Sequence, residues 1–442
     1  MRQVVSHKMQ HIAIFGAGLS GRAAYKRARQ LGIGCVVHDD HLALHEDIAS
    51  ADWQDWQSWD WQAVDALVLS PGIAHSFPAP HEVAVAAKSH GVEIISEVEF
   101  GLRTGQWGKL VVITGTNGKS TTTALTGHIL KSAGLDVRVG GNLGTALCEM
   151  ADNPDGVTIL ELSSYQLETS PSLAPDISAL LNITPDHLDR HGGLAGYIDA
   201  KKIALRAVGS DGLCLLSDKS EIMAGVHDWA KATLPAEILV VGTNDIAQIA
   251  TDNTYLAGAH NKQNAAFATK IAQRCGVSDD DITSAIADFV GLDHRLQPVG
   301  ARGDISFVND SKATNGDASA KALGAYQNII WLAGGRAKAD GLAACEPYFT
   351  HITRAHFYGE CAAEFYEQAK DHLSCATHDT LDEAFDSATK SLPEAGVILL
   401  SPAAASFDQF PNFGARGSHF AALVSDYLAK DTSPSETGGQ PC

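Results

Sequence analysis

The side chains best suited to chemistry lie in residues 109–123. An apolar run at residues 110–113 predicts a buried strand, and a helix is predicted from Ser120 to about residue 133. Between them, TGTNGKSTT at residues 114–122 supplies a glycine turn. A helix N-terminus presents free N–H groups and a positive dipole end, so this unit is suited to hold an anion. Lys119 adds a charge for outer phosphates, and the Ser120 hydroxyl suits a Mg²⁺ that bridges them.

The loop differs from the standard Walker form, which needs a glycine where this chain has Ile113. The shorter G-x-x-G-K-S-T form keeps two glycines and the Lys-Ser pair. We therefore predict a nucleotide-phosphate site in preference to an ordinary glycine turn. The residues predicted around the phosphates are Gly115, Thr116, Asn117, Gly118, Lys119, Ser120 and Thr121.

Length and composition limit the class of protein. A chain of 442 residues suggests about three domains at roughly 150 residues each. The composition, 45% hydrophobic and 19% charged, is that of a globular protein. The formal net charge of -20 argues against a nucleic acid or an anionic membrane surface as partner. An anionic nucleotide can still bind where local Lys, Arg, Mg²⁺ and helix ends outweigh the overall field.

The cysteines and the chain ends predict the cellular setting. The eight cysteines are scattered and form no C-x-x-C motif. The N-terminal segment does not have the pattern of a signal peptide. We therefore expect reduced thiols in a cytoplasmic protein. No apolar run reaches about 18 residues, so no membrane-spanning helix is expected. Residues 1–9 form a polar extension, and residues 430–442, rich in Ser, Thr, Gly and Pro, are predicted to be disordered.

A second glycine turn, GAGLSG, lies at residues 16–21. A strand is predicted before it at residues 11–15, a helix after it at 22–31, and a second strand at 35–38 that ends at Asp39. This is a βαβ unit with an acidic residue where a ribose hydroxyl would be met. The pattern fits NAD, or any nucleotide diphosphate whose phosphates reach the helix N-terminus.

Four tryptophans lie before the next predicted strand, which covers residues 64–69 and ends in the loop 70–73. A further strand is predicted at 92–96. The tryptophans, at positions 53, 56, 59 and 61, stand among Asp and Gln. They fit either an aromatic binding platform or an amphipathic helix or loop docked on the sheet. We favour docking, because indoles most often bury surface area.

Two predicted strands in the middle of the chain, residues 157–162 and 177–183, end in polar loops. Glu161, near the end of the first, can hold the Mg²⁺ of a nucleotide or cap the next turn. TPDHLDRH at residues 184–191 follows the second and fits either a metal or phosphate site or a solvated polar loop. Zinc is disfavoured because no cysteine is nearby.

Further candidates lie on two predicted helices. Lys201 and Lys202 stand next to each other, and a solvated helix face is the ordinary interpretation of such a pair. Asn261 lies at the start of a helix that runs to about Cys275. Asn261 can either cap that helix or meet a base edge.

The last part of the chain predicts a third sheet with a ligand edge. Residues 293–298 suggest a hinge before it. The predicted strands at 305–308, 329–332 and 397–400 are followed by NDSKATN, GGRAKAD and SPAAASFDQFPNF respectively. Loops of this kind at successive strand ends are typical of a doubly wound sheet. Lys312 and Lys338, in the first two loops, suit a carboxylate or phosphorylated ligand.

These loops, in this order, resemble the Mur ligases of peptidoglycan synthesis over residues 10–428. The resemblance implies an α/β fold of three domains: a Rossmann-like domain that binds the UDP substrate (1–100), a central P-loop-type ATPase domain with a mostly parallel sheet (101–297), and a Rossmann-like domain that binds the amino acid (298–442). TGTNGKST is the family's own phosphate loop. The branch that adds D-glutamate matches best.

The resemblance also implies a reaction. An ATP-dependent, ADP-forming amide ligase would add D-glutamate to UDP-N-acetylmuramoyl-L-alanine in cytoplasmic peptidoglycan precursor synthesis. The alanyl carboxylate would attack the γ-phosphate of ATP, and the amine of D-glutamate would then attack the acyl phosphate. Closure of the third domain near residues 294–298 would exclude water. We expect a monomer with no nucleic-acid partner and no membrane insertion.

Matching motif by motif, the resemblance assigns roles to individual residues. One Mg²⁺ would be held by Ser120 and Glu161, and a second by His187. Lys201 would be carbamylated, because a carbamate supplies the anionic oxygen that Mg²⁺ prefers. Lys119, Glu161, His187 and Lys201 would form the catalytic group.

The remaining assignments concern the ligands. The UDP substrate would meet Leu19, Ser20, Asp39, Gly72, Asn142 and His187. ATP would further meet Asn261, Asn264, Arg295 and Asp310. The amino acid would meet Lys312, Thr314, Lys338, Ser406, Phe407 and Phe413, with Phe407 where a leucine is common in the family.

Several alternatives stay open. A sister ligase adding L-alanine shares the N-terminal turn, although NDSKATN and residues 401–413 favour the D-glutamate enzyme. The ligase that adds diaminopimelate or lysine is disfavoured because its Asp-Asn-Pro-Arg motif is absent from the C-terminal domain. A folylpolyglutamate-type ligase lacks the first βαβ unit. From other classes, the chain fits an NAD-dependent oxidoreductase with an added ATPase module, or a non-catalytic nucleotide-binding regulator.

Overall fold

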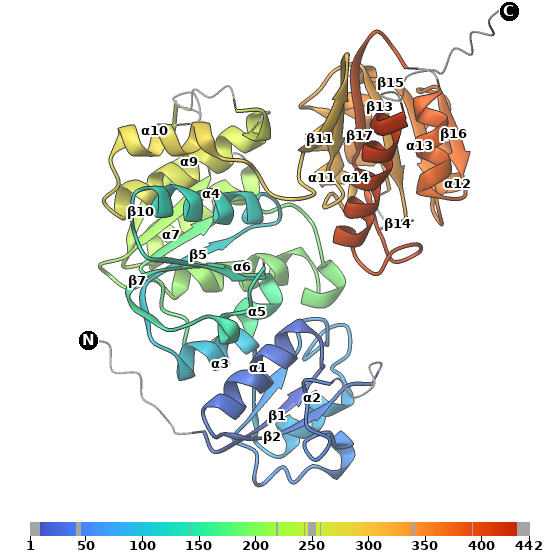
Figure 1. Ribbon diagram of the computed structural model, residues 1–442. Helices are drawn as coiled ribbons and strands as arrows, with labels where there is room; N and C mark the ends of the chain where they lie inside the picture. Colours follow the sequence, from blue (N-terminus) through green and yellow to red (C-terminus); the bar gives the residue numbers. More distant parts are fainter. Residues whose placement is uncertain are drawn as a thin grey trace, which may run out of the picture. The chain divides into compact units, whose positions relative to one another are not determined.

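The computed structural model divides the chain into two compact units (Figure 1). Unit 1 comprises residues 1–250 and 263–287, and unit 2 comprises residues 251–262 and 288–442. The residues that the structure describes are 9–40, 46–142, 144–217, 220–242, 244–245, 253–256, 258–337, 341–390 and 392–430. Lys338, nearly all of the polar extension and the predicted C-terminal tail beyond residue 430 lie outside them.

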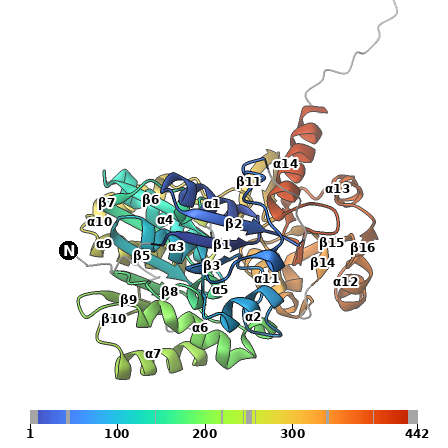
Figure 2. The same cartoon turned by 90° about the horizontal axis from the view of Figure 1, so that it is seen from below.

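Unit 1 begins with a four-stranded parallel sheet in the order β2-β1-β3-β4 (Figure 2). Its elements are β1 (His11–Phe15), α1 (Leu19–Gln30), β2 (Gly34–His38), η1 (Trp56–Ser58), β3 (Ala66–Leu69), α2 (Glu82–Ser89), β4 (Glu93–Ile95) and α3 (Glu97–Thr104). Apolar side chains of α1 and α3 bury one face of the sheet, and those of α2 bury the other. The predicted βαβ unit is confirmed, although α1 begins at Leu19 rather than at Arg22.

Three of the four tryptophans pack on the face that α2 covers, and Trp53 packs against the cluster on the other face. Trp59 and Trp61 are buried beside Phe15 and Val64, and their indole rings meet edge to face at 5.5 Å. Trp56 begins the short turn η1 and is partly buried against the same cluster. The docking interpretation of these tryptophans is therefore confirmed, and the segment is a loop with one 3-10 turn.

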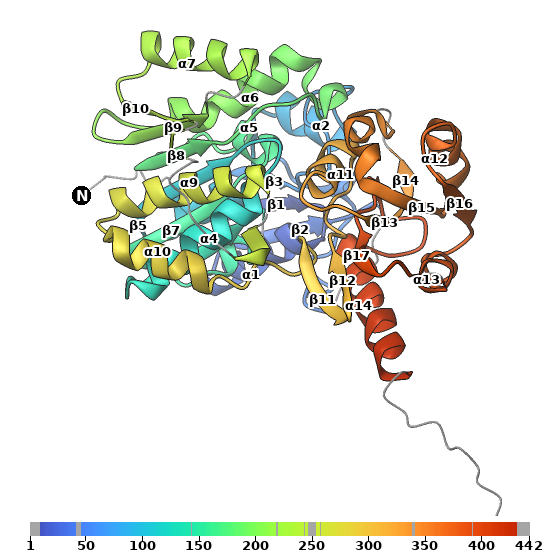
Figure 3. The same cartoon turned by 90° about the horizontal axis from the view of Figure 1, so that it is seen from above.

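The second sheet of unit 1 has six parallel strands in the order β10-β9-β8-β5-β7-β6. Figure 3 shows α6 and α7 on one face of it and α4, α9 and α10 on the other. Its elements are β5 (Trp107–Thr114), α4 (Lys119–Ser132), β6 (Val137–Gly141), η2 (Leu147–Glu149), β7 (Asn153–Glu161), α5 (Ser164–Glu168), β8 (Ile177–Leu180), η3 (Leu188–His191), α6 (Leu194–Arg206), β9 (Leu213–Ser217), α7 (Glu221–Thr233), β10 (Glu237–Val241), α9 (Ala259–Arg274) and α10 (Asp279–Asp288).

Buried polar contacts of α3 join the two sheets of unit 1. The backbone N–H of Cys148 donates to the Glu97 carboxylate at 2.6 Å, and the N–H of Ser172 donates to Glu99 at 3.0 Å. Both glutamates are almost completely buried. Burial raises the pKa of Glu97 to about 7. The junction therefore rests on fixed hydrogen bonds as well as on apolar packing.

Unit 2 contains a six-stranded sheet in the order β11-β12-β17-β13-β15-β16. β11 runs antiparallel to β12, and the other pairs are parallel. α11, η5 and α12 bury one face, and α13 and α14 bury the other. Its elements are η4 (Thr254–Leu256), β11 (Gln297–Arg302), β12 (Asp304–Asn309), α11 (Gly316–Leu323), β13 (Ile329–Gly334), β14 (Arg336–Ala337), η5 (Ala343–His351), β15 (Ile352–Tyr358), α12 (Ala362–Ala369), β16 (Cys375–His378), α13 (Leu381–Thr389), β17 (Ala395–Leu400), β18 (Ala404–Ala405) and α14 (Phe413–Lys430).

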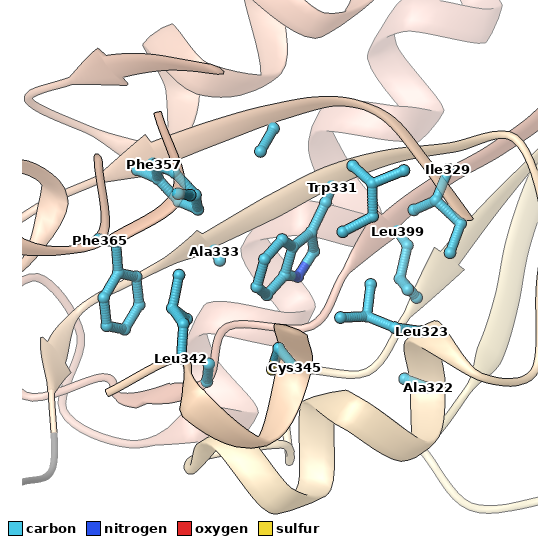
Figure 4. Close-up of a cluster of buried hydrophobic side chains, with 14 of the residues drawn as sticks. Ala322, Leu323, Ile329, Trp331, Ala333, Leu342, Cys345, Phe357, Phe365 and Leu399 are labelled. Atoms are coloured by element: carbon cyan, nitrogen blue, oxygen red, sulfur yellow. The ribbon is translucent and has the colours of Figure 1, made fainter. Parts of the chain in front are cut away.

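Trp331 lies at the centre of the core of unit 2 (Figure 4). Its ring meets Phe357 edge to face at 5.7 Å, and Leu323 and Leu399 lie in the same buried cluster. Its indole N–H donates to the carbonyl of Ser401 at 2.7 Å. The core thus holds the first residue of a predicted ligand loop in place.

The structure confirms an α/β fold with mainly parallel sheets, and every strand predicted above is present. The prediction missed β6, β9, β10, β11, β14, β15, β16 and β18. Among the described residues, no helix combines the length and apolarity needed to cross a membrane. All seven described cysteines are free thiols, as expected. The division into three domains stays a prediction.

Candidate active site

The phosphate loop joins β5 to α4 in a conformation that only glycine adopts easily. Gly115 has φ +153° and Gly118 has φ +85°. A Cβ at Gly118 would lie 2.4 Å from the Asn264 side-chain oxygen, so the helix start and Asn264 approach each other only because no side chain intervenes. Asn264, predicted from the resemblance, therefore does lie beside the loop.

Hydrogen bonds from the loop after β8 hold the phosphate loop. The Asn182 side chain accepts from the backbone N–H of Asn117 and donates to its carbonyl, both at 2.9 Å. The Thr116 hydroxyl donates to the Thr184 carbonyl at 3.1 Å and accepts from the N–H of Thr184 at 3.0 Å. The loop is thus held in shape by the protein itself, as an anion cradle requires.

Two lysines converge on this loop. The Lys119 ammonium donates to the carbonyls of Gly115 and Thr116 at 2.9 and 2.8 Å. From α6, the Lys201 amine donates to the same Gly115 carbonyl at 2.9 Å. Ser120 is buried beneath the loop, and Thr121 is half-buried.

Lys201 is 1% exposed and lies 4.8 Å from the centre of the Tyr197 ring. Burial, helped by the nearby charge of Lys119, lowers the pKa of Lys201 well below its usual value, against the opposing pull of Asp186 and Glu161. Its neighbour Lys202 instead packs on Trp229. The solvated-face interpretation is therefore wrong for Lys201, because the register of α6 turns this side chain inward.

Glu161 lies at the end of β7 and is buried. Its carboxylate accepts from the Asn142 side chain at 2.9 Å, and its carbonyl accepts from the Asn142 N–H at 2.7 Å. The next helix, α5, is capped by Ser163, which forms a capping box with Gln166. The alternative that Glu161 caps the next turn is therefore wrong, and its carboxylate stays at the strand end.

His187 opens η3 with φ +54°, an uncommon conformation for a residue other than glycine. Its ring is 43% exposed, lies 3.5 Å from Asp186 and packs against Tyr165 at 5.2 Å. Within the described residues, no group of three or more His, Cys, Asp or Glu side chains is arranged to hold a metal ion. A metal here would need ligands from a bound substrate.

The first glycine turn is built into its sheet. The N–H of Gly16 donates to the His38 carbonyl at 2.8 Å, and the N–H of Ala17 donates to the Asp39 carboxylate at 2.7 Å. A Cβ at Gly21 would lie 1.9 Å from the Gly16 carbonyl oxygen, so α1 packs against the turn through this glycine. Asp39 thus supports the turn with one carboxylate oxygen.

Three other residues predicted for the UDP substrate lie at the same edge. Leu19 is 76% exposed and Ser20 is half-buried at the start of α1. Gly72 is exposed in the loop after β3, where the Ser70 hydroxyl donates to the Gly16 carbonyl at 3.0 Å. Asn142 lies elsewhere, on the central sheet next to Glu161.

Unit 2 gathers its own predicted residues. Asp310 is buried and accepts from the N–H of Leu296 at 3.2 Å and the Ser401 hydroxyl at 2.8 Å, and burial raises its pKa to about 7. The Lys312 ammonium lies 3.8 Å from the centre of the Phe413 ring. The other described members here are Thr314, bonded to Lys312 through the backbone, half-buried Arg295, buried Ser406, and Phe407, 65% exposed.

The prediction that Asn261 caps its helix is wrong. Because α9 begins at Ala259, Asn261 lies inside the helix and is not its N-cap. Its side-chain amide is buried and donates to the Tyr255 carbonyl at 3.4 Å. The alternative of a base contact stays a prediction.

Comparison with known proteins identifies the family. A model of the Mur ligase middle domain matches residues 113–272. A UDP-N-acetylmuramoylalanine–D-glutamate ligase of Agrobacterium fabrum is 39% identical, covering 96% of this chain and 97% of the relative. An enzyme of the same name from Rhodospirillum rubrum is 40% identical, covering 98% and 97%. The chain belongs to the Mur ligase family.

Solved structures agree on the fold of this Mur ligase. The UDP-N-acetylmuramate-alanine ligase MurC from Thermotoga maritima aligns with TM-score 0.61 and 16% identity, covering 95% of this chain and 99% of that one. A murein peptide ligase from Psychrobacter arcticus aligns with TM-score 0.52 and 16% identity, covering 95% and 98%. At such identity the likeness concerns the fold alone.

The sequence analysis of this Mur ligase missed Arg416. This fully buried arginine in α14 donates to the Ser311 hydroxyl and carbonyl at 3.0 and 2.9 Å, and to the carbonyls of Ala404 and Gly334 at 3.1 and 3.3 Å. It therefore ties together the three predicted loops of unit 2. A single arginine outside the predicted motifs carries no signal in a sequence, and the same holds for Asn182.

Proposed function

We propose that this Mur ligase joins D-glutamate to UDP-N-acetylmuramoyl-L-alanine, with conversion of ATP to ADP and phosphate. The observation that carries the proposal is the identity of 39% and 40% to two ligases of that name, over 96% and 98% of the chain. The geometry of the phosphate loop supports the chemistry, because Lys119 and Lys201 both reach the Gly115 carbonyl at the end of β5 and Asn182 fixes the loop between strand and helix.

In the first step, the alanyl carboxylate attacks the γ-phosphorus of ATP and the bond to ADP breaks. The proposed role of Lys119 is to stabilise the negative charge that develops on the phosphate oxygens, together with the backbone N–H groups at the start of α4. The hydrogen bonds of Asn182 and Thr184 support this role, because a loop already in shape needs no reorganisation during the reaction.

Ser120 and Glu161 are proposed to hold Mg²⁺, with His187 at a second ion. A hydroxyl and a carboxylate are the hard oxygen donors that Mg²⁺ prefers. Few protein ligands suffice, because phosphate oxygens and water complete the coordination of nucleotide-bound Mg²⁺. When bound, Mg²⁺ would offset negative charge on the phosphates.

We also propose that Lys201 carries a carbamate. A neutral amine adds its nitrogen to the carbon of CO₂ and releases one proton to water. The lowered pKa of Lys201 supports the proposal, because it favours the neutral amine that this addition needs. The product would turn a cation into an anionic oxygen ligand beside Glu161.

The second step is assigned to residues of unit 2. The amine of D-glutamate attacks the carbonyl carbon of the acyl phosphate, and phosphate leaves. Lys312, Thr314, Lys338, Ser406, Phe407 and Phe413 are proposed to hold the amino acid, and Asn261, Asn264, Arg295 and Asp310 to complete the ATP contacts. Leu19, Ser20, Asp39, Gly72 and Asn142 are proposed to bind the UDP substrate. The domain boundaries given above are part of the same proposal.

Phosphate release from ATP tests the function directly. The full chain is supplied with UDP-N-acetylmuramoyl-L-alanine, Mg²⁺, bicarbonate and one amino acid at a time. Release with D-glutamate alone is the expected result. Release with L-alanine, on UDP-N-acetylmuramate, would make the chain the sister ligase. No release with any amino acid, combined with NADH binding seen by fluorescence transfer, would favour the oxidoreductase.

A further inference from the structure

Two loops of unit 1 that belong to different sheets are hydrogen-bonded to each other. One is residues 70–77, which follow β3 of the first sheet, and the other is residues 184–193, which follow β8 of the central sheet. Arg190, in η3, donates from its guanidinium to the carbonyls of Gly72 at 2.9 Å and Pro71 at 3.5 Å. The arginine side chain is therefore hydrogen-bonded to the backbone of the loop that carries Gly72.

The Arg190 guanidinium is itself held by an aromatic ring. It lies 4.6 Å from the centre of the Tyr165 ring. The same ring stacks on His191 at 5.3 Å and meets His187 at 5.2 Å. Tyr165 thus contacts both Arg190 and His187, the histidine that is proposed to act near the phosphates.

A second connection runs through Glu168. One of its carboxylate oxygens lies 3.3 Å from Nδ1 of His191, and the other lies 3.5 Å from Nε2 of His75. Phe77 adds a third connection, because a Cβ at Gly192 would lie only 3.0 Å from its ring. Three separate contacts therefore join the same two loops.

The order Ser164, His191, Glu168 resembles a hydrolase triad, with Nε2 of His191 2.9 Å from the Ser164 hydroxyl. Ser164 is only 3% exposed, so a substrate carbonyl has no access to it. The group is therefore suited to holding loops together and not to nucleophilic attack.

We propose that Arg190 is a positioning residue that sets the spacing between the two ends of the UDP-substrate site. The inference rests on the proposed function, in which Gly72 belongs to the UDP-substrate site and His187 holds a metal ion at the end that reacts; we place the Gly72 loop, which belongs to the domain assigned to the UDP substrate, at the nucleotide end. Arg190 and His187 share one short segment, so the loop that serves the reacting end is anchored on the loop that serves the nucleotide end.

This arrangement has a thermodynamic consequence. A ligand that reaches both loops gains affinity from their fixed spacing, because binding at one end places the other end in position. UDP alone reaches only the first loop and gains nothing. Loss of the Arg190 contacts should therefore weaken binding of the whole substrate and leave binding of UDP unchanged.

Calorimetry on the full chain with Arg190→Ala tests the proposal, using UDP and UDP-N-acetylmuramoyl-L-alanine as the two ligands. We expect the Kd of the whole substrate to rise about tenfold, since hydrogen bonds from a charged group are lost. The Kd of UDP and the KM for ATP should change less than about twofold on the same argument. Equal weakening of both ligands, or no weakening of either, would overturn the proposal.

Arg206→Ala is the matched control. Its guanidinium also lies over an aromatic ring, that of Trp229 at 5.1 Å, and it pairs with Asp199 at 3.6 Å on α6. This variant should bind both ligands as the wild type does. A rise in Kd of the whole substrate in Arg206→Ala equal to that in Arg190→Ala would overturn the specific role of Arg190.

Two further measurements separate positioning from folding. Ethylguanidinium should restore affinity for the whole substrate to Arg190→Ala without a change in melting temperature. If Arg190→Ala does not fold, Arg190→Lys replaces it, because lysine keeps the charge but not the forked donor. The Kd of the whole substrate should then rise while the Kd of UDP stays unchanged, and any other pair of values would overturn the proposal. Inactivity of the wild type in phosphate release would instead contradict the proposed function, so the two failures are distinguishable.

Discussion

The two strand–glycine–helix turns of unit 1 both place a glycine with positive φ after the strand, but they differ in the charged side chains around them. Gly16 follows β1 with φ +99°, and Gly115 follows β5 with φ +153°. The first turn has no lysine or arginine among residues 16–21, and Leu19 is 76% exposed. The second turn carries Lys119 and lies over buried Lys201.

The difference shows where reactivity comes from. A glycine turn at a helix N-terminus is enough to receive a phosphate group. Transfer of a phosphoryl group further needs charges placed around it. The proposed function assigns those charges to Mg²⁺ held by Glu161 at the end of β7 and to a carbamate on Lys201 of α6, elements that are distant in sequence from the turn.

Replacing Lys119 should distinguish the roles of the two turns most clearly, because it should change kcat and not the binding of UDP. We expect Lys119→Ala to lower kcat roughly 1,000-fold, because the developing charge on the phosphate loses its point cation. Binding of UDP at the first turn should be unchanged, which calorimetry can measure. A variant that releases phosphate at a rate near that of the wild type would remove the second turn from the chemistry.

Lys201→Ala should have the next largest effect. Loss of the buried side chain should lower kcat roughly 100-fold, and a short-chain carboxylate such as acetate should restore part of the activity if the lysine acts as a carbamate. Phosphate release with and without added carboxylate is the measurement. Lys202→Ala, which removes the neighbouring lysine on Trp229, should keep kcat. Failure of the carboxylate to restore any activity would count against the carbamate.

Gly21→Ala should destabilise the first turn, because the new Cβ clashes with the backbone of that turn. The added Cβ would meet the Gly16 carbonyl oxygen at 1.9 Å, so α1 must move, and the free energy of unfolding should fall by about 3 kcal/mol. Gly225→Ala is the control, because this glycine lies inside α7 with no atom within 4 Å of the new Cβ. The control should gain roughly 0.5–1 kcal/mol. Thermal unfolding checks both, and equal stability of the two variants would contradict the packing argument.

Glu97→Gln tests the junction that holds the two turns in one unit, and it should have the smallest effect on activity. Burial raises the pKa of Glu97 from 4.5 to about 7, so the folded state keeps this proton more tightly than the unfolded state. The wild type should therefore lose stability as pH rises from about 4.5 to about 7, and the amide should remove that loss. Between pH 4 and pH 8, the stability of the variant relative to the wild type should therefore rise by about 3 kcal/mol, at about 1.4 kcal/mol for each unit of pKa difference.

Denaturant unfolding at the two pH values measures this difference. The KM for ATP should not change, because Glu97 bonds to Cys148 and not to the phosphate loop. A difference between wild type and variant that is the same at both pH values would show that Glu97 ionises normally in the folded protein.

Much of the site could be predicted because its signals are local. The apolar run of β5, the spacing of its glycines and the Lys-Ser pair lie within one short segment, so the order of strand, turn and helix follows from neighbouring residues. The same holds for β1, α1 and β2. The edge strands β11 and β16 were missed because their apolar patterns are short.

The sequence by itself determined the order of the motifs and the types of group at each strand end. The tertiary structure alone decided which of two adjacent lysines faces the phosphate loop, that Ser163 and not Glu161 caps α5, and that Arg190 and Arg416 hold loops from separate segments. The physical reason is that side-chain direction, burial and a hydrogen-bond partner depend on neighbours distant in the chain, whereas turn geometry and strand or helix preference depend on adjacent residues.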